Sequence, residues 1–286
     1  MASRFGNHPG SLRVGIVDYL NSRPLAWSFR RPPAPSGVPP LEPVYLPPSG
    51  VAEGLASGDL DIGLVPSIEV RRIPGLRVVP GLCVAATREV RSVLLVRRGP
   101  VEEIRSVALD ENSRTSAALV RILLGQRYGL EPSYRQAPPE VEAMLEEADA
   151  ALVIGDPALV VDRTRHQVSD LAAEWRAWTG LPFVFAVWAV APGVEFRPGL
   201  ADFFSESLDR AEREMEVLVR EAALELELPG EALAAYLTEN LSFRLGEPEL
   251  AGLRLYHRRA AEMGLVPESG PLRFWDGCPE SDEAVE

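Results

Sequence analysis

One strand and its exit decide the fold: residues 13–25 have the sequence RVGIVDYLNSRPL. Residues 14–20 form an apolar run rich in β-branched side chains, which is typical of a buried strand. The run breaks at Asn21 and Ser22, which are suited to cap a helix, and Pro24 fits the first turn of that helix. A strand that leads directly into a helix leaves free backbone N–H groups at its carboxyl end, and these favour an anion.

The same succession of strand and helix recurs along the chain. Apolar strands are expected at residues 59–66, 76–79, 81–85, 90–96, 107–109, 150–154 and 183–190. Helices are expected at residues 51–57, 115–128, 139–147, 200–226, 230–239 and 247–263, with one more around Trp175 and Trp178. The proline-rich residues 31–48 are expected to form an irregular connection. This alternation predicts an α/β fold with largely parallel strands and helices on both faces.

Two such α/β series are joined by two extended crossings, at residues 90–96 and 183–190. The pattern predicts two lobes with a ligand cleft between them and a hinge at the crossings. We expect residues 1–94 and 188–286 to form the first lobe and residues 95–187 to form the second.

Composition excludes several classes of function. The net charge of −13 disfavours binding to nucleic acid or to an anionic membrane, and no apolar run is long enough to span a bilayer. The 286 residues include no lysine, which excludes Schiff-base chemistry, a lysine base and a P-loop lysine. His8, His166 and His257 are expected to be solvated residues rather than catalysts.

The cysteine pattern and the first residues predict a cytoplasmic protein. Cys83 and Cys278 lie far apart without metal-ligand spacing, so both thiols are expected to be free in a reduced compartment. Residues 1–12 are polar and do not contain the apolar core of a signal peptide. We expect no cofactor and no metal, and the sequence leaves the oligomeric state open.

Short polar side chains gather where the predicted strands end. In open α/β sheets ligands bind outside the carboxyl ends of strands, and hydroxyls and amides at helix starts suit a small, oxygen-rich anion. Helix capping is a purely structural alternative for all of these residues except Ser92, which lies in a crossing strand, and Trp175 and Trp178 are expected to serve packing. The candidate ligand-binding residues are Asn21, Ser67, Ser92, Ser113, Thr115, Ser116 and Asp156.

Several motifs, in this order, resemble those of the chorismate dehydratases of the futalosine route to menaquinone. The resemblance covers residues 12–265 and implies the fold of type II periplasmic binding proteins, two α/β lobes around a cleft. The motifs are YLNSRPL at residues 19–25, DLDIGLVPSIE at 59–69, VRSV at 90–93, SRTS at 113–116, EADAALVIGD at 147–156, WTGLPFVFA at 178–186 and SFRLG at 242–246.

The resemblance implies removal of water from chorismate to give 3-[(1-carboxyvinyl)oxy]benzoate. It implies that Asn21 and Ser92, which match the family pattern, are the functional pair. Chorismate is a small dianion, and Ser113, Thr115 and Ser116 are suited to donate hydrogen bonds to its carboxylates. Aromatisation of the ring supplies much of the driving force, so we expect the protein to supply mainly orientation.

Alternatives stay open at this point. The proton acceptor is either a carboxylate of the substrate or Asp156, and Arg91 and Arg114 are candidates to neutralise a substrate carboxylate. Other functions on the same fold are a small-anion binding protein without chemistry, the sister lyase of the pathway that forms a dihydroxynaphthoate, and the effector domain of a transcription factor. A missing signal peptide argues against the first, the opening motif against the second, and the lack of a helix-turn-helix segment against the third.

Overall fold

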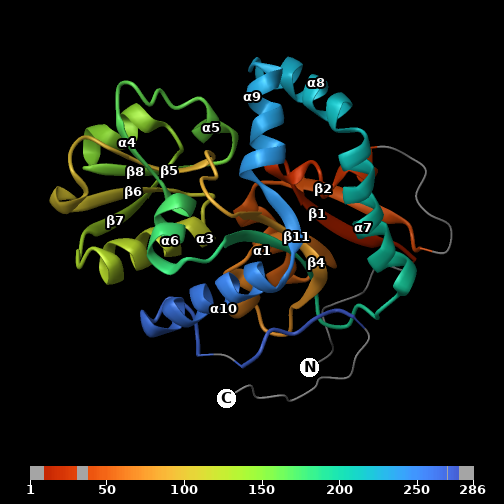
Figure 1. The fold of residues 1–286 in the computed structure, drawn as a ribbon. Helices are drawn as coiled ribbons and strands as arrows, with labels where there is room; N and C mark the ends of the chain where they lie inside the picture. The colour runs from red at the N-terminus through yellow and green to blue at the C-terminus, as the bar shows by residue number, and fades with distance from the viewer. Residues whose placement is uncertain (1–9, 31–37, 269, 277–286) are drawn as a thin grey trace.

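The computed structural model describes residues 10–30, 38–268 and 270–276 and contains two β-sheets, each covered by helices (Figure 1). The first sheet has the strand order β11-β4-β10-β3-β1-β2 and the second the order β7-β6-β8-β5-β9. The strands are β1 (Leu12–Val17), β2 (Leu41–Leu46), β3 (Ile62–Pro66), β4 (Arg77–Ala86), β5 (Val93–Arg97), β6 (Ser106–Asp110), β7 (Ser133–Ala137), β8 (Ala150–Ile154), β9 (Gln167–Asp170), β10 (Phe183–Val190) and β11 (Ser242–Leu245).

Both sheets are mixed, which corrects the prediction of a largely parallel arrangement. In the first sheet, β1 is parallel to β2 and β3, whereas β10 is antiparallel to β3 and β4. In the second sheet, β6 is parallel to β7 and β8, whereas β5 is antiparallel to β8 and β9. The antiparallel pairs arise where the chain enters or leaves a sheet: β5 is the first strand of the second sheet, and β10 returns to the first.

Four strands were not predicted from the sequence, and they are the edge strands β2, β7, β9 and β11. An edge strand is half exposed, so it needs no continuous apolar run. In β2 (LEPVYL) no residue is fully buried, and Pro43 lies where an edge strand tolerates a residue without an N–H. The predicted irregular connection at residues 31–48 therefore contains a strand, while residues 31–37 lie outside the described part.

The helices agree broadly with prediction. Three kinds of difference occur. Residues 200–226 form two helices that meet at Glu214, and residues 115–128 and 230–239 each contain a π-helical turn after the α-helix. The short helices at residues 69–72 and 156–159 were not predicted. The helices are α1 (Pro48–Ser57), α2 (Glu69–Arg72), α3 (Thr115–Ile122), α4 (Val141–Glu147), α5 (Asp156–Leu159), α6 (Leu171–Thr179), α7 (Pro198–Arg213), α8 (Met215–Leu226), α9 (Gly230–Ala235) and α10 (Glu247–Glu262), with π turns at Leu123–Arg127 and Tyr236–Asn240.

The exit of β1 differs from its prediction. The strand ends at Val17, and the chain continues in two 3₁₀ turns, Leu20–Ser22 and Trp27–Arg30. Asn21 lies inside the first turn, and no side chain caps that turn. The prediction of an α-helix starting here is therefore wrong, and Asn21 is not a helix cap.

The chain passes between the sheets through two short connectors. Residues 87–92 lead from β4 to β5, and residues 180–182 lead from α6 back to β10. The expected lobe boundaries, 94/95 and 187/188, each fall within a strand. We propose that each sheet with its helices is one lobe, and that the boundaries lie at these connectors.

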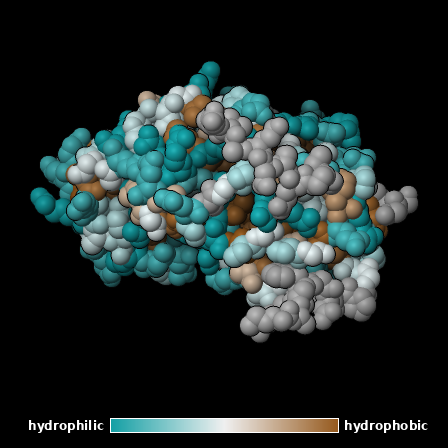
Figure 2. Space-filling model, turned by 90° about the horizontal axis from the view of Figure 1, so that it is seen from below, coloured by the Kyte–Doolittle hydropathy of each residue, from teal (hydrophilic) through white to brown (hydrophobic). Residues whose placement is uncertain are grey.

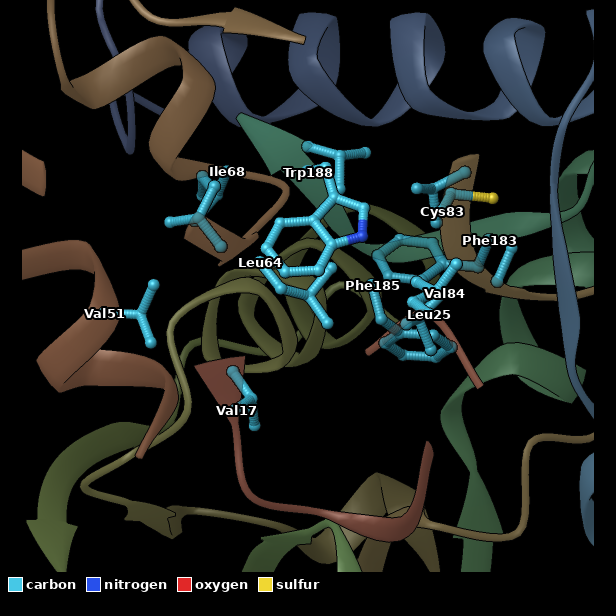
Figure 3. Close-up of a cluster of buried hydrophobic side chains, with 14 of the residues drawn as sticks. Val17, Leu25, Val51, Leu64, Ile68, Cys83, Val84, Phe183, Phe185 and Trp188 are labelled. Atoms are coloured by element: carbon cyan, nitrogen blue, oxygen red, sulfur yellow. The ribbon is translucent and has the colours of Figure 1, made fainter. Parts of the chain in front are cut away.

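A large apolar core surrounds the first sheet and continues into the second sheet, where it includes Leu95, Leu109 and Leu152 (Figure 3). Trp188 on β10 lies near its centre and is fully buried, as are Leu64 on β3 and Phe183. A smaller apolar cluster, which includes Leu94 and Val153, belongs to the second sheet alone. The face of the molecule in Figure 2 is largely hydrophilic, with apolar residues in small separate patches. The burial that stabilises this fold is therefore concentrated inside the layers.

Within the described residues, no helix is both long and apolar enough to cross a bilayer. The same residues hold no group of three His, Cys, Asp or Glu side chains arranged to bind a metal ion. Cys83 is a buried free thiol. Cys278 and His8 lie outside the described residues.

The cleft between the two sheets

A partly open cavity lies between the two sheets. It opens at the carboxyl ends of parallel strands from both sheets, because its wall includes the last residues of three strands, Val17 of β1, Pro66 of β3 and Ile154 of β8. This is where α/β sheets bind ligands. The polar residues of the wall are Tyr19, Asn21, Ser22, Asn112, Ser113, Arg114, Thr115 and Ser116.

Of the seven predicted site residues, four line this cavity: Asn21, Ser113, Thr115 and Ser116. Asn21 comes from the 3₁₀ turn after β1, and its Oδ1 accepts a hydrogen bond of 3.2 Å from the Ser22 hydroxyl. The other three come from the opposite sheet, at the start of α3. The cleft thus brings together an amide from one sheet and hydroxyls from the other.

The start of α3 is a helix end without a side-chain cap. The alternative that residues 113–116 serve to cap this helix is therefore wrong, and the hydroxyls of these residues have other environments. Ser113 Oγ is buried and has no partner among the described residues. Thr115 Oγ1 accepts from the backbone N–H of Ile68 at 3.3 Å. A free hydroxyl beside an uncapped helix N-terminus is an arrangement suited to an anion.

Ser92 is fully buried and does not line the cavity. It precedes β5, and its hydroxyl accepts a hydrogen bond of 2.7 Å from Tyr236 Oη. The preceding Arg91 has a φ of 66°, a left-handed conformation that is costly for a residue with a side chain. Asp170 holds this turn, because its carboxylate accepts from the N–H groups of Val90 and Arg91 at 2.7 to 3.1 Å.

Ser67 is also fully buried outside the cavity wall. Its hydroxyl donates to the carbonyl of Val184 at 2.8 Å, and its own carbonyl accepts from His257 Nε2 at 2.9 Å. The expectation of a solvated His257 is wrong, since this ring is 4% exposed. Burial and the nearby Arg71 guanidinium lower the pKa of His257 to about 3, which keeps the ring neutral.

Asp156 connects the two sheets. Its carboxylate, at the start of α5, accepts from the backbone N–H of Leu20 at 3.0 and 3.3 Å. The acceptor thus stabilises the turn that carries Asn21, although 136 residues separate the partners. Burial raises the pKa of Asp156, and the hydrogen bonds from Leu20 and the charge of Arg23 oppose that rise.

The two candidate arginines have different positions. Arg114 lines the cavity and forms an ion pair of 2.7 Å with Glu53. Arg91 is not in the wall. Trp178 is also outside the wall, and the Arg259 guanidinium lies 4.1 Å from its ring centre, in agreement with the expected packing role.

Sequence reasoning missed Tyr19, Tyr236 and Asp170. Tyr19 falls within the apolar run predicted as a strand, and its pKa is raised by burial and by Asp110 and Asp156. Tyr236 hydrogen-bonds Ser92, which is 144 residues away, and Asp170 hydrogen-bonds Val90, which is 80 residues away. No local sequence pattern indicates contacts between such distant residues. A signal for Tyr19 exists in the motif YLNSRPL, which begins with it.

Comparison with solved structures identifies the fold. A protein from Archaeoglobus fulgidus matches with a TM-score of 0.75 and 15% identity, covering 91% of this chain and all of that one. The periplasmic aliphatic sulphonate binding protein of Escherichia coli matches with a TM-score of 0.64 and 20% identity, covering 98% and 96%. The predicted fold, that of periplasmic binding proteins, is confirmed.

Sequence comparison identifies the family. The chain is 29% identical over 265 residues to a chorismate dehydratase of Thermus thermophilus, covering 85% of this chain and 93% of that protein. It is 31% identical over 174 residues to a chorismate dehydratase of Campylobacter jejuni, covering 60% and 64%. A family model described as menaquinone biosynthesis matches residues 12–262. The chain therefore belongs to this menaquinone-biosynthesis family.

Proposed function

We propose that this protein is a chorismate dehydratase, a lyase that removes water from chorismate to give 3-[(1-carboxyvinyl)oxy]benzoate. The observation that carries the proposal is the composition of the cavity wall. An amide, Asn21, faces the cavity from one sheet, and the uncapped start of α3 with Ser113, Thr115 and Ser116 faces it from the other. Such a site suits a small ligand with carboxylates and hydroxyls.

The substrate is a dianion, whereas the chain has a net charge of −13. The site must therefore supply local hydrogen-bond donors that outweigh the general repulsion. The free hydroxyl of Ser113 and the first N–H groups of α3 are the donors proposed for one carboxylate. Arg114 is the proposed cation beside it, because it lies in the wall.

We propose that Asn21 and Ser92 hold the departing hydroxyl and the enolpyruvyl side chain in the geometry for elimination. A ring C–H proton passes to a carboxylate of the substrate, which delivers it to the departing hydroxyl as the ring C–O bond breaks, so that the hydroxyl leaves as water. The electron pair of the C–H bond completes the aromatic ring. Asp156 is the less suitable base, since both of its oxygens already accept from the backbone N–H of Leu20.

The direct test is to incubate the purified protein with chorismate and to follow the aromatic product by absorbance and mass. We expect a product lighter by one water, and its loss in the Asn21→Ala and Ser92→Ala variants. Asp59→Asn is the control, because Asp59 lies outside the wall and, within the described part of the chain, its carboxylate accepts a hydrogen bond only from the Ser57 hydroxyl. Turnover by wild type and by both site variants alike would contradict the proposed site.

A small-anion binding protein without chemistry is the second candidate, because solved structures with this fold include a sulphonate binding protein. Chorismate that binds and is recovered unchanged would favour this candidate.

We also propose a cytoplasmic location. The buried free thiol of Cys83 fits a reduced compartment.

A further inference from the structure

Four polar side chains, Ser22, Asn21, Tyr236 and Ser92, follow one another in a chain from the cavity wall inward. The Ser22 hydroxyl donates to Asn21 Oδ1 at 3.2 Å, and the Asn21 side chain lies near enough to the Tyr236 phenol to lower its pKa as a hydrogen-bonding neighbour. Tyr236 Oη in turn donates to Ser92 Oγ at 2.7 Å. The chain begins in the wall and ends at the second residue of the proposed functional pair.

The direction of these bonds follows from the chemistry of the groups. An amide whose oxygen accepts from Ser22 has its N–H groups left to donate, so the phenol oxygen is their acceptor. Tyr236 is 1% exposed, and burial raises its pKa, so the phenol keeps its proton at neutral pH. That proton goes to Ser92, whose own proton must then point elsewhere. Among the described residues, Ser92 Oγ has no acceptor for it.

The backbone on both sides of this contact is specialised. Tyr236 is the first residue of the π-helical turn that follows α9, and α9 lies near the middle of the molecule in Figure 1. π turns are rare and occur often at functional sites. On the other side, Ser92 follows the left-handed Arg91, held by Asp170. A rare π turn on one side and a costly left-handed residue on the other thus flank one hydrogen bond.

We propose that Tyr236 is a positioning residue for dehydration, which orients the Ser92 hydroxyl so that it donates to the substrate. The proposal rests on the proposed function and on the Asn21–Ser92 pair. Each bond of the chain polarises the next, so the Ser92 proton is a stronger donor than that of an isolated serine. Because Ser92 lies behind the wall, its donation requires the cleft to adjust around the bound ligand.

The test is the variant Tyr236→Phe, which removes only the hydroxyl. We expect kcat for chorismate to fall about 10- to 100-fold, while KM stays within about threefold, because orientation of a reacting group acts on the chemical step. Tyr128→Phe is the matched control. It removes a phenol that donates to Glu174 at 2.6 Å, outside the cavity wall, and its kinetics are expected to equal those of wild type.

A double-mutant cycle separates positioning from a general structural role. If Tyr236 acts through Ser92, its substitution in a Ser92→Ala background causes no further loss of turnover, measured by mass after long incubation. Ser22→Ala, tested in the wild-type and Ser92→Ala backgrounds, examines the hydrogen bond from Ser22 to Asn21. It replaces Tyr236→Phe as the test variant if Tyr236→Phe fails to fold. Two results would overturn the proposal. One is that Tyr236→Phe lowers kcat in the Ser92→Ala background by the same factor as in wild type, and the other is that Tyr236→Phe alone keeps kcat within about twofold of wild type.

The same experiment distinguishes two failures. If Asn21→Ala and Ser92→Ala both turn over chorismate like wild type, the proposed site is wrong. If both lose turnover while Tyr236→Phe and Ser22→Ala keep it, the site stands and the positioning role of Tyr236 is wrong.

Discussion

The ring of Tyr19 lies directly against the backbone of Gly155, across the cleft between the two sheets. A β-carbon on Gly155 would come within 2.7 Å of two ring carbons, and Gly155 has a φ of 67°. Both residues line the cavity, and each follows the end of a buried strand, β1 or β8. Glycine is therefore required at this position for two reasons, the backbone conformation and the approach of the ring.

We expect Gly155→Ala to displace Tyr19 and to raise KM for chorismate by at least tenfold, because the ring forms part of the cavity wall. Gly180→Ala is the control for a positive φ alone, since Gly180 has a φ of 73° but a β-carbon added to it would meet no atom within 4 Å. The backbone cost is larger for Gly155→Ala, because Gly155 has a ψ of −147°, a region that is occupied almost only by glycine, whereas Gly180 has a ψ of 3° and is left-handed helical. An equal KM in the two variants would show that the contact with Tyr19 does not shape the site.

Two buried serines are expected to respond oppositely to replacement by alanine. Ser113 Oγ has no partner among the described residues, so Ser113→Ala should leave stability nearly unchanged and raise KM about 5- to 50-fold through loss of a donor to a carboxylate. Ser67 donates to the Val184 carbonyl, so Ser67→Ala should cost about 1 to 3 kcal/mol of unfolding free energy. Chemical denaturation measures the stability of the two variants, and steady-state kinetics measures their KM. A large loss of stability in Ser113→Ala together with a raised KM in Ser67→Ala would refute the roles assigned to the two serines.

Asp156 provides a test of the proton acceptor. An Asn side chain still offers one oxygen to the Leu20 N–H but is no base, so Asp156→Asn should retain kcat within about fivefold if the substrate carboxylate takes the proton. Asp156→Ala removes the acceptor and should lower both stability and turnover, because the turn with Asn21 loses its partner. Complete loss of turnover in a folded Asp156→Asn protein would identify Asp156 as the base.

The strands in the centre of each sheet could be predicted from sequence because they are apolar along their whole length. Burial is complete in β3 and β8, and both strands lie where the apolar runs predict them. Local patterns failed where a distant partner decides the structure. The turn at Asn21 is stabilised by Asp156, and the turn at Ser92 by Asp170, so neither residue continues the predicted helix or strand.

The influence of distant partners also explains which residues of the site could be predicted from the sequence. Asn21 and the hydroxyls of α3 could be named because they follow strand ends, where ligands bind in α/β folds. Ser67 was named for that reason too, yet its hydroxyl serves the Val184 carbonyl. Tyr236 could not be found, because it reaches Ser92 from a helix 144 residues further along the chain.

The last prediction concerns His257, which is buried between Arg71 and the Ser67 carbonyl. Its Nδ1 accepts from Arg71 Nε at 3.0 Å while Nε2 donates to Ser67, so both ring nitrogens are used by the neutral form. The folded-state pKa of about 3 lies below the ordinary value of 6.5. Between these values the unfolded chain binds a proton that the folded protein does not, so stability is fully present above pH 6.5 and is lost as the pH falls.

We expect the unfolding free energy of wild type to contain a component that falls by up to about 1.4 kcal/mol per pH unit below about pH 6. His257→Gln lacks this titration, so the difference between the two proteins should shrink by that slope as the pH falls. Asp110, Asp156 and Asp170 have raised pKa values and act in the opposite direction, but they are present in both proteins and cancel in the difference. Denaturation in urea from about pH 7.5 to about pH 4.5 measures the difference in unfolding free energy between the two proteins. If their unfolding free energies changed in parallel with pH, His257 would be protonated in the folded state.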